Sequence, residues 1–236
     1  MAYYPIFVDM TGRRVLVVGG GHVAEEKVAG LLKAEMAGRV TLVAPKLLPS
    51  LQRLLAEGQI DLIQREYREG DMEGFDFVMV ATDDGKVNAE VAAEGKRRRI
   101  WVNAADDPKN CDFILPAVVR QGQIVVAAST GGASPALARR LREELTDYLS
   151  EDFAPLAELI GEVRAELRRK HVTPSAETWQ RAIDGQLRAL LAQRRWGQAR
   201  ARLIRALGVA DVIPIGVEYE DERASEAPSA VGVEAK

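Results

Sequence analysis

A run of three glycines directly after an apolar, β-branched segment constrains this chain more than any other feature. Val15–Val18 is typical of a strand, and the next six residues, Gly19 to Ala24, fit the pattern G-x-G-x-x-A. Apolar residues then recur at helical spacing from Val23 to Glu35. Gly19 permits a sharp turn, Gly21 leaves room for a diphosphate, and Ala24 allows the helix to pack closely on the strand. The pattern therefore predicts a dinucleotide site, with a tight turn that holds no ligand as the alternative.

Strands and helices are expected to alternate over the first hundred residues. The expected strands are residues 15–18, 40–43, 60–63, 77–80 and 100–102, and the expected helices are 23–35, 47–56 and 88–98. The strands are apolar throughout, which is typical of parallel strands with both sheet faces covered. We therefore predict an α/β domain of the Rossmann type, with helices on both faces of a parallel sheet, over residues 1–113.

The pattern changes in the second half of the chain. Residues 113–119 and 124–128 read as a hairpin around a glycine-containing turn. Ser134 followed by Pro135 indicates the start of a helix that runs to about Leu149. Beyond it we expect an all-α domain over residues 151–210, with helices interrupted near Thr173-Pro174, Gly185 and Gly197. Residues 218–236 are rich in Glu, Ala, Ser and Pro, which predicts a disordered tail.

Charge and composition exclude several classes of partner. The net charge of −3 gives no global basic field for nucleic acid or acidic lipid. The single cysteine, Cys111, cannot form an intrachain disulfide, and we expect a small buried residue there rather than a nucleophile. The N-terminus lacks the features of a secretory signal, and no apolar run approaches the ~20 residues that span a bilayer. We expect a cytoplasmic protein with no nucleic-acid or membrane partner. Two scattered histidines predict no metal site.

The cofactor contacts are expected at the ends of successive strands. Around the turn we predict contacts from Gly19, Gly21, His22 and Val23. The second strand ends in Ala44, Pro45 and Lys46, without the acidic residue that usually holds the adenosine ribose. Lys46 can accommodate the 2′-phosphate of NADP; alternatively, backbone groups of Ala44, Pro45 and Lys46 hold the ribose of NAD.

Four ordered blocks carry a resemblance to a known family. They are Pro5–Val8 with Gly12–Lys27, Ala81–Asp84 with Asn88, Val102–Pro108, and Ser129–Ala138. Together they resemble the precorrin-2 dehydrogenase / sirohydrochlorin ferrochelatase family, which includes the N-terminal half of bacterial siroheme synthase. The match spans about residues 3–150, and four motifs in order are far more specific than the glycine turn alone.

The resemblance implies an activity and an assembly. It implies an NAD-binding domain, a dimerisation segment over residues 114–150, a helical C-terminal domain, and a homodimer in which both subunits form the substrate cleft. The implied reaction is the NAD-dependent oxidation of precorrin-2 to sirohydrochlorin. Some relatives then insert Fe²⁺ to give siroheme, and others do not.

Asp106 is the predicted catalytic carboxylate, because it matches the functional Asp of the family. It follows the fifth strand, and ligands bind beyond the carboxyl ends of parallel strands. Removing a hydride from a reduced macrocycle also requires loss of a proton, which a positioned carboxylate can accept. In a ferrochelatase step the same group could take pyrrole protons or hold the metal. A loop cap is the alternative role, and Asp107 is the competing carboxylate, although its place before Pro108 favours a turn.

The remaining site predictions leave alternatives open. Asn103 either contacts the cofactor or fixes its loop. Thr82 and Asp83 are expected near the nicotinamide half of the cofactor, and a helix cap is the alternative role for Asp83 and Asp84. A loop of small residues with N–H groups ahead of a helix is expected to bind a substrate carboxylate; its residues are Ser129, Thr130, Gly131 and Gly132. A different class of function, a regulatory module that senses NAD(H), would need neither this loop nor the block around Asn103.

Overall fold

The computed structural model describes residues 3–36, 38–104 and 108–215. The chain divides into two compact units, Met1–Leu115 and Pro116–Lys236, and each is described by itself. Asp106, Asp107 and the predicted tail over 218–236 lie outside the described residues. Within the described part, no helix has both the length and the apolar character needed to cross a membrane.

The first unit is built on a parallel sheet of five strands. They are β1 (Val15–Val18), β2 (Val40–Val43), β3 (Asp61–Ile63), β4 (Phe77–Val80) and β5 (Trp101–Ala104). Every neighbouring pair is parallel, and the order across the sheet is β3-β2-β1-β4-β5. The expected Rossmann-type sheet is therefore confirmed. The direction of winding reverses between β1 and β4, and open α/β sheets bind ligands at the carboxyl ends of strands beside such a reversal.

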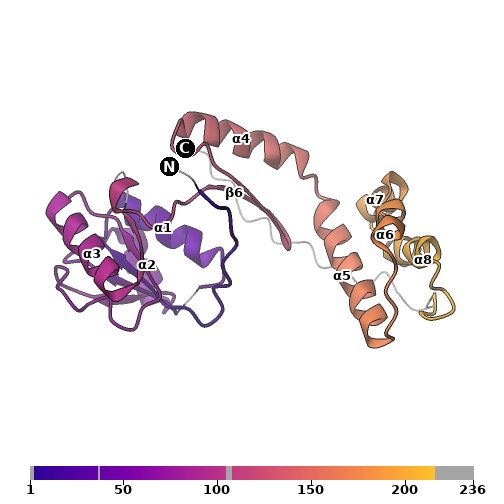
Figure 1. Ribbon diagram of the computed structural model, residues 1–236, viewed down its shortest axis with the longest axis horizontal. Coiled ribbons are helices and arrows are strands. Elements are labelled where there is room, and N and C mark those ends of the chain that lie inside the picture. The colour runs from indigo at the N-terminus through magenta and orange to yellow at the C-terminus, as the bar shows by residue number, and fades with distance from the viewer. Residues whose placement is uncertain (1–2, 37, 105–107, 216–236) are drawn as a thin grey trace. The chain divides into compact units, whose positions relative to one another are not determined.

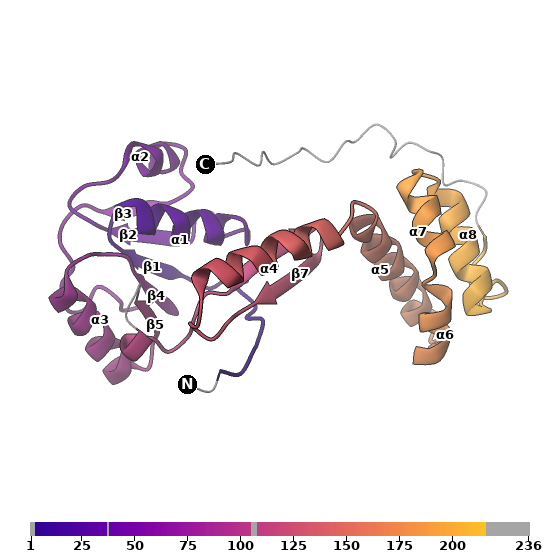
Figure 2. The same cartoon turned by 90° about the horizontal axis from the view of Figure 1, so that it is seen from above.

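Helices cover both faces of this sheet. Helices α1 (His22–Leu32) and α2 (Pro49–Ala56) lie on one face, and α3 (Gly85–Arg98) lies on the other (Figures 1 and 2). Val15 and Val17 join the core under α1 and α2, whereas Leu16 and Val18 join the core under α3. Because successive side chains point to opposite covered faces, every residue of β1 is buried. This is why the strands read as continuous apolar runs.

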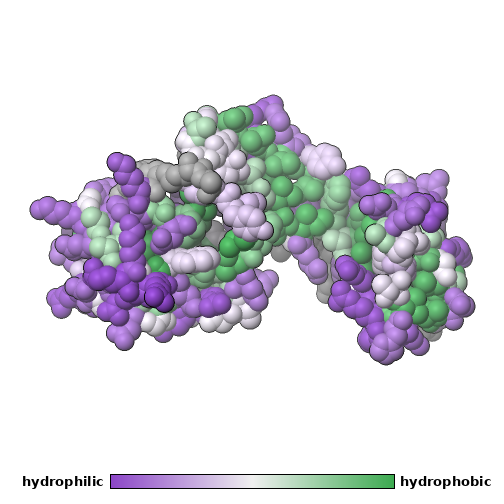
Figure 3. All heavy atoms as spheres, viewed as in Figure 1, coloured by the Kyte–Doolittle hydropathy of each residue, from purple (hydrophilic) through white to green (hydrophobic). Residues whose placement is uncertain are grey.

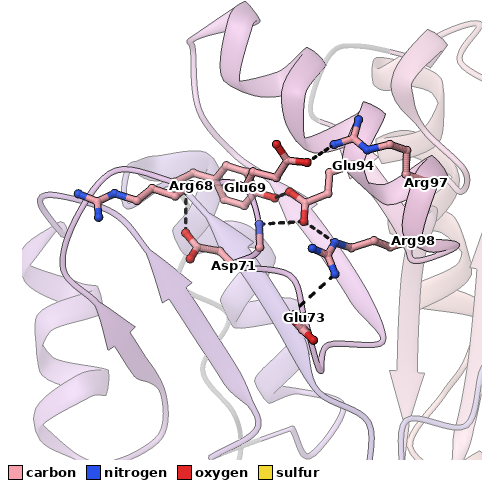
Figure 4. A network of polar contacts seen from close by, with 9 residues as sticks. Arg68, Glu69, Asp71, Glu73, Glu94, Arg97 and Arg98 are labelled. Carbon is pink, nitrogen blue, oxygen red and sulfur yellow. Dashed lines mark hydrogen bonds and ion pairs between the residues drawn. The ribbon is translucent and has the colours of Figure 1, made fainter.

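A buried carboxylate fixes the connection between β3 and β4. Residues 64–76, all described, form no helix and are tied to α3 through Glu94, which is 1% exposed. Glu94 accepts hydrogen bonds from the Tyr67 hydroxyl (2.6 Å), the Gly70 N–H (2.9 Å) and the Arg98 guanidinium (2.6 Å) (Figure 4). Burial of the Tyr67 hydroxyl, together with its hydrogen bond to Glu94, raises the pKa of Tyr67. Two donors from the segment, the Tyr67 hydroxyl and the Gly70 N–H, therefore hold it to the buried carboxylate without regular secondary structure, while Arg98 of α3 itself bonds the same carboxylate.

The second unit starts with a hairpin and continues in helices. The elements are β6 (Ala117–Gln121), β7 (Ile124–Ala128), α4 (Pro135–Tyr148), α5 (Phe153–Arg169), α6 (Ala176–Ala182), α7 (Gly185–Ala192) and α8 (Trp196–Leu207). The hairpin is confirmed: Gln121 pairs with Ile124, and Gly122 has a φ of +57° in the turn. The start of α4 is also as predicted, because the Ser134 hydroxyl accepts the N–H of Leu137 at 3.2 Å. Helices α5 to α8 share one apolar core.

The three expected helix interruptions are confirmed. Residues 170–175 separate α5 from α6, residues 183–184 separate α6 from α7, and residues 193–195 separate α7 from α8. Asp184 caps α7 by accepting the N–H of Leu187 at 2.8 Å, and Arg194 has a φ of +57° in the break before α8. Gly185 and Gly197 lie in the first turns of α7 and α8, where a glycine costs a helix less than in its interior.

Candidate functional site

Each of the three glycines after β1 meets a different constraint. Gly19 has a φ of +124°, and a Cβ there would lie 2.2 Å from the Ala81 carbonyl oxygen at the end of β4. A Cβ on Gly20 would lie 2.2 Å from the carbonyl oxygen of Lys46, just after β2. At Gly21 no described heavy atom lies within 4 Å of a Cβ position. The first two glycines are therefore required by the protein itself, and the third leaves space above the turn.

The space at Gly21 opens onto the N-terminus of α1. Gly21 is the N-cap residue, and among the described residues no side chain caps the helix there. His22 and Val23 are exposed, whereas Ala24 is fully buried against the sheet. The imidazole of His22 lies 3.5 Å from the carboxylate of Glu25. We therefore expect the backbone N–H of His22, rather than its imidazole, to bind an anion at the turn. Uncapped N–H groups at the positive end of a helix dipole favour an anion such as a diphosphate.

The segment after β2 contributes backbone groups rather than a carboxylate. Ala44 is 2% exposed, whereas Pro45 and Lys46 are exposed. The Leu48 N–H donates to the Gly20 carbonyl at 3.0 Å, which ties this segment to the glycine turn. Because Pro45 has no N–H, a ribose here would meet backbone carbonyls and the N–H and side chain of Lys46. The arrangement of Ala44, Pro45 and Lys46 therefore favours neither NAD nor NADP over the other.

The two aspartates after β4 have different environments. Asp84 is the N-cap of α3, and its Oδ1 accepts the N–H groups of Lys86 (2.8 Å) and Val87 (3.4 Å). Thr82, which is half-buried, accepts the Asp84 N–H at 3.1 Å. The capping alternative therefore holds for Asp84, while Asp83 is exposed beside it. Thr82 lies next to the glycine turn, since a Cβ on Gly19 would lie 3.4 Å from the Thr82 backbone nitrogen.

Asn103 in β5 is held by hydrogen bonds within the protein. It is 6% exposed; its Oδ1 accepts the ammonium of Lys27 at 2.6 Å, and its Nδ2 donates to the Phe113 carbonyl at 2.9 Å. These bonds tie β5 to α1 and to the Phe113 backbone, and both roles predicted for Asn103 stay predictions. Asp106, the predicted catalytic residue, follows two residues after the end of β5 and lies outside the described residues.

Two residues with evident roles here were not singled out from the sequence. Lys27 is 76 positions from Asn103, and Gly20 occupies a variable position of the glycine pattern. Only the order of the strands places their partners beside them, so no local signal identifies them. Cys111 also differs from expectation: it is half-buried rather than buried, and its thiol bonds to the backbone of Ala104.

The predicted substrate loop belongs to the second unit and is ordered by its own side chains. The Ser129 hydroxyl accepts the Gly131 N–H at 3.1 Å, and the Thr130 hydroxyl accepts the Ser134 N–H at 3.2 Å. Gly131 and Gly132 have φ values of +63° and +87°, and no described atom crowds either one. The loop ends at the capped start of α4. Over the described residues of both units, no cluster of three or more potential metal ligands occurs.

Two family models match the chain. A model described as putative NAD(P)-binding covers residues 6–117, and a model described as sirohaem biosynthesis protein central covers residues 123–148. The first therefore spans the parallel sheet with its glycine turn. The second spans β7, the loop after it and α4.

Curated relatives and a solved structure extend this similarity. The chain is 36% identical over 205 residues to siroheme synthase 1 of Serratia proteamaculans, which is 86% of this chain and 43% of the relative. It is 38% identical over 212 residues to the siroheme synthase of Methylococcus capsulatus, covering 89% of this chain and 44% of the relative. The chain thus spans less than half the length of these relatives. The solved structure of SirC, precorrin-2 dehydrogenase, is similar with a TM-score of 0.68 and 32% identity, over 83% of this chain and 98% of that one.

Proposed function

Because this chain belongs to the family of precorrin-2 dehydrogenases and siroheme synthases, we propose that it oxidises precorrin-2 to sirohydrochlorin with NAD⁺. The similarity to SirC over 98% of that chain carries the proposal. The open glycine turn supports it independently, because it leaves room for a dinucleotide where this fold binds one.

The residues at the carboxyl edge of the sheet fit NAD. We assign the diphosphate to the backbone around Gly19, Gly21, His22 and Val23, where no side chain of the described residues caps helix α1. The adenosine ribose is assigned to Ala44, Pro45 and Lys46, and the nicotinamide half to Thr82, Asp83 and Asn103, in keeping with the order of the strands. The exposed side chain of Lys46 keeps NADP as the alternative nucleotide.

The chemistry needs an acceptor for a hydride and another for a proton. Bound NAD⁺ supplies the hydride acceptor. Precorrin-2 loses two hydrogens in becoming sirohydrochlorin, so one proton must also leave, and we assign its removal to the carboxylate of Asp106. In the sequence, Asp106 follows the last residue of β5, Ala104, by two positions. The products are sirohydrochlorin, NADH and a proton.

The hairpin and α4 support the proposed homodimer. Helix α4, all of whose residues are described, has no buried residue, and Leu137 and Tyr148 on it are 50% and 69% exposed. Val118 on β6 is also exposed, and apolar residues gather over the hairpin and α4 in Figure 3. A two-stranded hairpin needs further packing for stability, which a second copy would provide. We propose that the loop of Ser129, Thr130, Gly131 and Gly132 contacts a substrate carboxylate in this assembly.

The proposed function also includes a cellular compartment and a second substrate, Fe²⁺. A single cysteine suits the reducing cytoplasm, where we place the protein. Fe²⁺ would be a second substrate if the chain shares the ferrochelatase activity of some relatives.

The decisive experiment mixes the purified chain with precorrin-2 and NAD⁺ and follows NADH by its absorbance. Parallel reactions with NADP⁺ settle the nucleotide, and addition of Fe²⁺ to sirohydrochlorin, followed by the spectrum of the metallated product, settles iron insertion. Asp106→Asn should retain NAD⁺ binding and lose most turnover, whereas the matched variant Asp107→Asn should retain both. NAD⁺ binding by the wild type without any NADH formation would instead favour the sensing role.

A further inference from the structure

Arg65 lies just beyond the end of β3, beside the segment assigned to the adenosine ribose. The carbonyl oxygen of Ile63, the last residue of β3, accepts the N–H of Ala44 at 3.3 Å and the N–H of Arg65 at 2.9 Å. The backbones of Ala44 and Arg65 therefore share one acceptor at the carboxyl edge of the sheet. All three residues belong to the first unit.

The order of the strands matches the order of the parts of a nucleotide. β1, β2 and β3 are neighbours in the sheet, at the usual spacing of about 4.8 Å. The diphosphate is assigned to the end of β1 and the adenosine ribose to the end of β2. Because the ribose separates the adenine from the diphosphate, the end of β3 is the next position along this edge for the base.

The guanidinium of Arg65 is held along its edge by a carboxylate. Its Nη1 and Nη2 donate to the two carboxylate oxygens of Asp71, each at 2.6 Å, and Nη1 also donates to the Glu66 carbonyl at 3.0 Å. The Asp71 carboxylate, whose side chain is 9% exposed, accepts the Arg68 N–H at 2.8 Å as well (Figure 4). A bidentate pair of this kind fixes the plane of the guanidinium and not only its position.

The Arg65 side chain remains accessible although its edge is bonded. It is 33% exposed. Aromatic rings lie over the guanidinium groups of Arg14 and Arg188, whereas no ring of the described residues lies over that of Arg65. A planar, weakly hydrated cation stacks well on a flat aromatic base.

We propose that Arg65 is the platform on which the adenine of the dinucleotide stacks, an inference that rests on the proposed function. Asp71 holds the plane of the guanidinium beside the ribose segment. The fork of N–H groups with which an arginine binds a 2′-phosphate is taken by Asp71. Arg65 therefore supports NAD⁺ and NADP⁺ alike.

The test compares Arg65→Lys with Arg13→Lys. Lysine at position 65 keeps a positive charge beside Asp71 but has no planar group. Arg13 is the matched control, because it also pairs with an aspartate, Asp76 at 2.7 Å, but precedes β1 at the opposite edge of the sheet. Calorimetric titration should give a Kd for NAD⁺ about 5- to 20-fold higher in Arg65→Lys and unchanged in Arg13→Lys. Urea unfolding of the same samples checks that both variants are folded.

Two further ligands and the turnover locate the effect on the adenine. ADP-ribose contains the adenine but no nicotinamide, so its Kd should rise by the same factor in Arg65→Lys as the Kd for NAD⁺. The factor for NADP⁺ should also be the same, because the stacked base is the same. The kcat with saturating NAD⁺ should not change, since the adenine is remote from the hydride transfer.

Other outcomes overturn the platform. An unchanged Kd for NAD⁺ or for ADP-ribose in folded Arg65→Lys refutes it. A larger effect on NADP⁺ than on NAD⁺ refutes it by assigning Arg65 to the 2′-phosphate, and a fall in kcat as large as the rise in Kd refutes it by placing Arg65 at the reacting atoms. If Arg65→Lys does not fold, Arg65→Gln, whose amide can still donate to Asp71, takes its place with the same outcomes. A wild type that binds NAD⁺ but does not oxidise precorrin-2 refutes the proposed function instead, and the three affinities then still decide on the platform.

Discussion

Gly21→Val should abolish most dinucleotide binding while leaving the chain folded. No described atom lies within 4 Å of a Cβ at this position, and the backbone, with φ −92° and ψ −166°, is open to residues with side chains. The cost to folding is confined to the poorer N-cap, about 1 kcal/mol or less. The added isopropyl group instead occupies the space in which the diphosphate would approach the N–H groups of α1.

The expected loss of affinity follows from the hydrogen bonds that the diphosphate would make. Losing two bonds from backbone N–H groups to a charged ligand, at about 1.5 kcal/mol each, costs about 3 kcal/mol. That corresponds to a rise of roughly 150-fold in the Kd for NAD⁺. Calorimetric titration with NAD⁺ measures the affinity, and urea unfolding of the same samples confirms that the variant is folded.

Two other glycines are the controls for this experiment. Gly30→Ala, at an exposed position within α1 where a Cβ also meets no described atom, should raise stability by about 0.5–1 kcal/mol and leave NAD⁺ affinity unchanged. Gly19→Ala should cost more than about 2 kcal/mol, since its Cβ would lie 2.2 Å from the Ala81 carbonyl oxygen at a φ of +124°. Normal NAD⁺ affinity in folded Gly21→Val would refute the assignment of the diphosphate to this turn.

Two further predictions concern the segment between β3 and β4. Glu94→Gln should lower the free energy of unfolding, measured by urea titration, by about 2–3 kcal/mol, because the buried acceptor loses its charge beside Arg98. Glu90→Gln, at an exposed position of the same helix, is the control and should leave the free energy of unfolding unchanged. The hydrogen bond from Arg65 lowers the pKa of Asp71 in the folded chain. The ionised carboxylate therefore stabilises the folded state above the unfolded pKa of about 4, and this stabilisation is lost as the pH falls through the lower folded pKa. Asp71→Asn should therefore be less stable than wild type at pH 7, and the gap should close in acid; a gap that persists there would contradict this role.

Local patterns were sufficient for the elements around the glycine turn. Val15–Val18, the turn and the apolar stripe of α1 are contiguous, so their periodicity and the conformational freedom of Gly19 identify them without knowledge of distant contacts. The same holds for Ser134 and Pro135 at the start of α4, where the cap and the first helical residue are neighbours in sequence.

Contacts between distant residues were beyond the reach of such patterns. The bond between Lys27 and Asn103 joins positions 76 apart, and that between Tyr67 and Glu94 joins positions 27 apart. From the sequence alone, a lysine or glutamate on a helix is expected to be exposed to solvent. Only the order of the strands in the folded sheet shows that a buried partner lies beside it. The exact helix bounds were also beyond reach, because the breaks expected near Gly185 and Gly197 fall at residues 183–184 and 193–195 and the sequence does not show at which residue α7 and α8 begin.

The three glycines together explain why one turn can organise the whole carboxyl edge of the sheet. Gly19 lets β1 approach the end of β4, and Gly20 lets it approach the segment after β2, so the ends of three strands meet at one point. Atoms of the protein's own backbone lie against those two positions, whereas of the three glycines Gly21 alone has no described atom within 4 Å of its Cβ position. A ligand at that position touches the helix dipole of α1 and lies beside the ribose side and the nicotinamide side of the sheet at once. The side chains that choose among nucleotides and carry out chemistry can then vary around the turn without altering it.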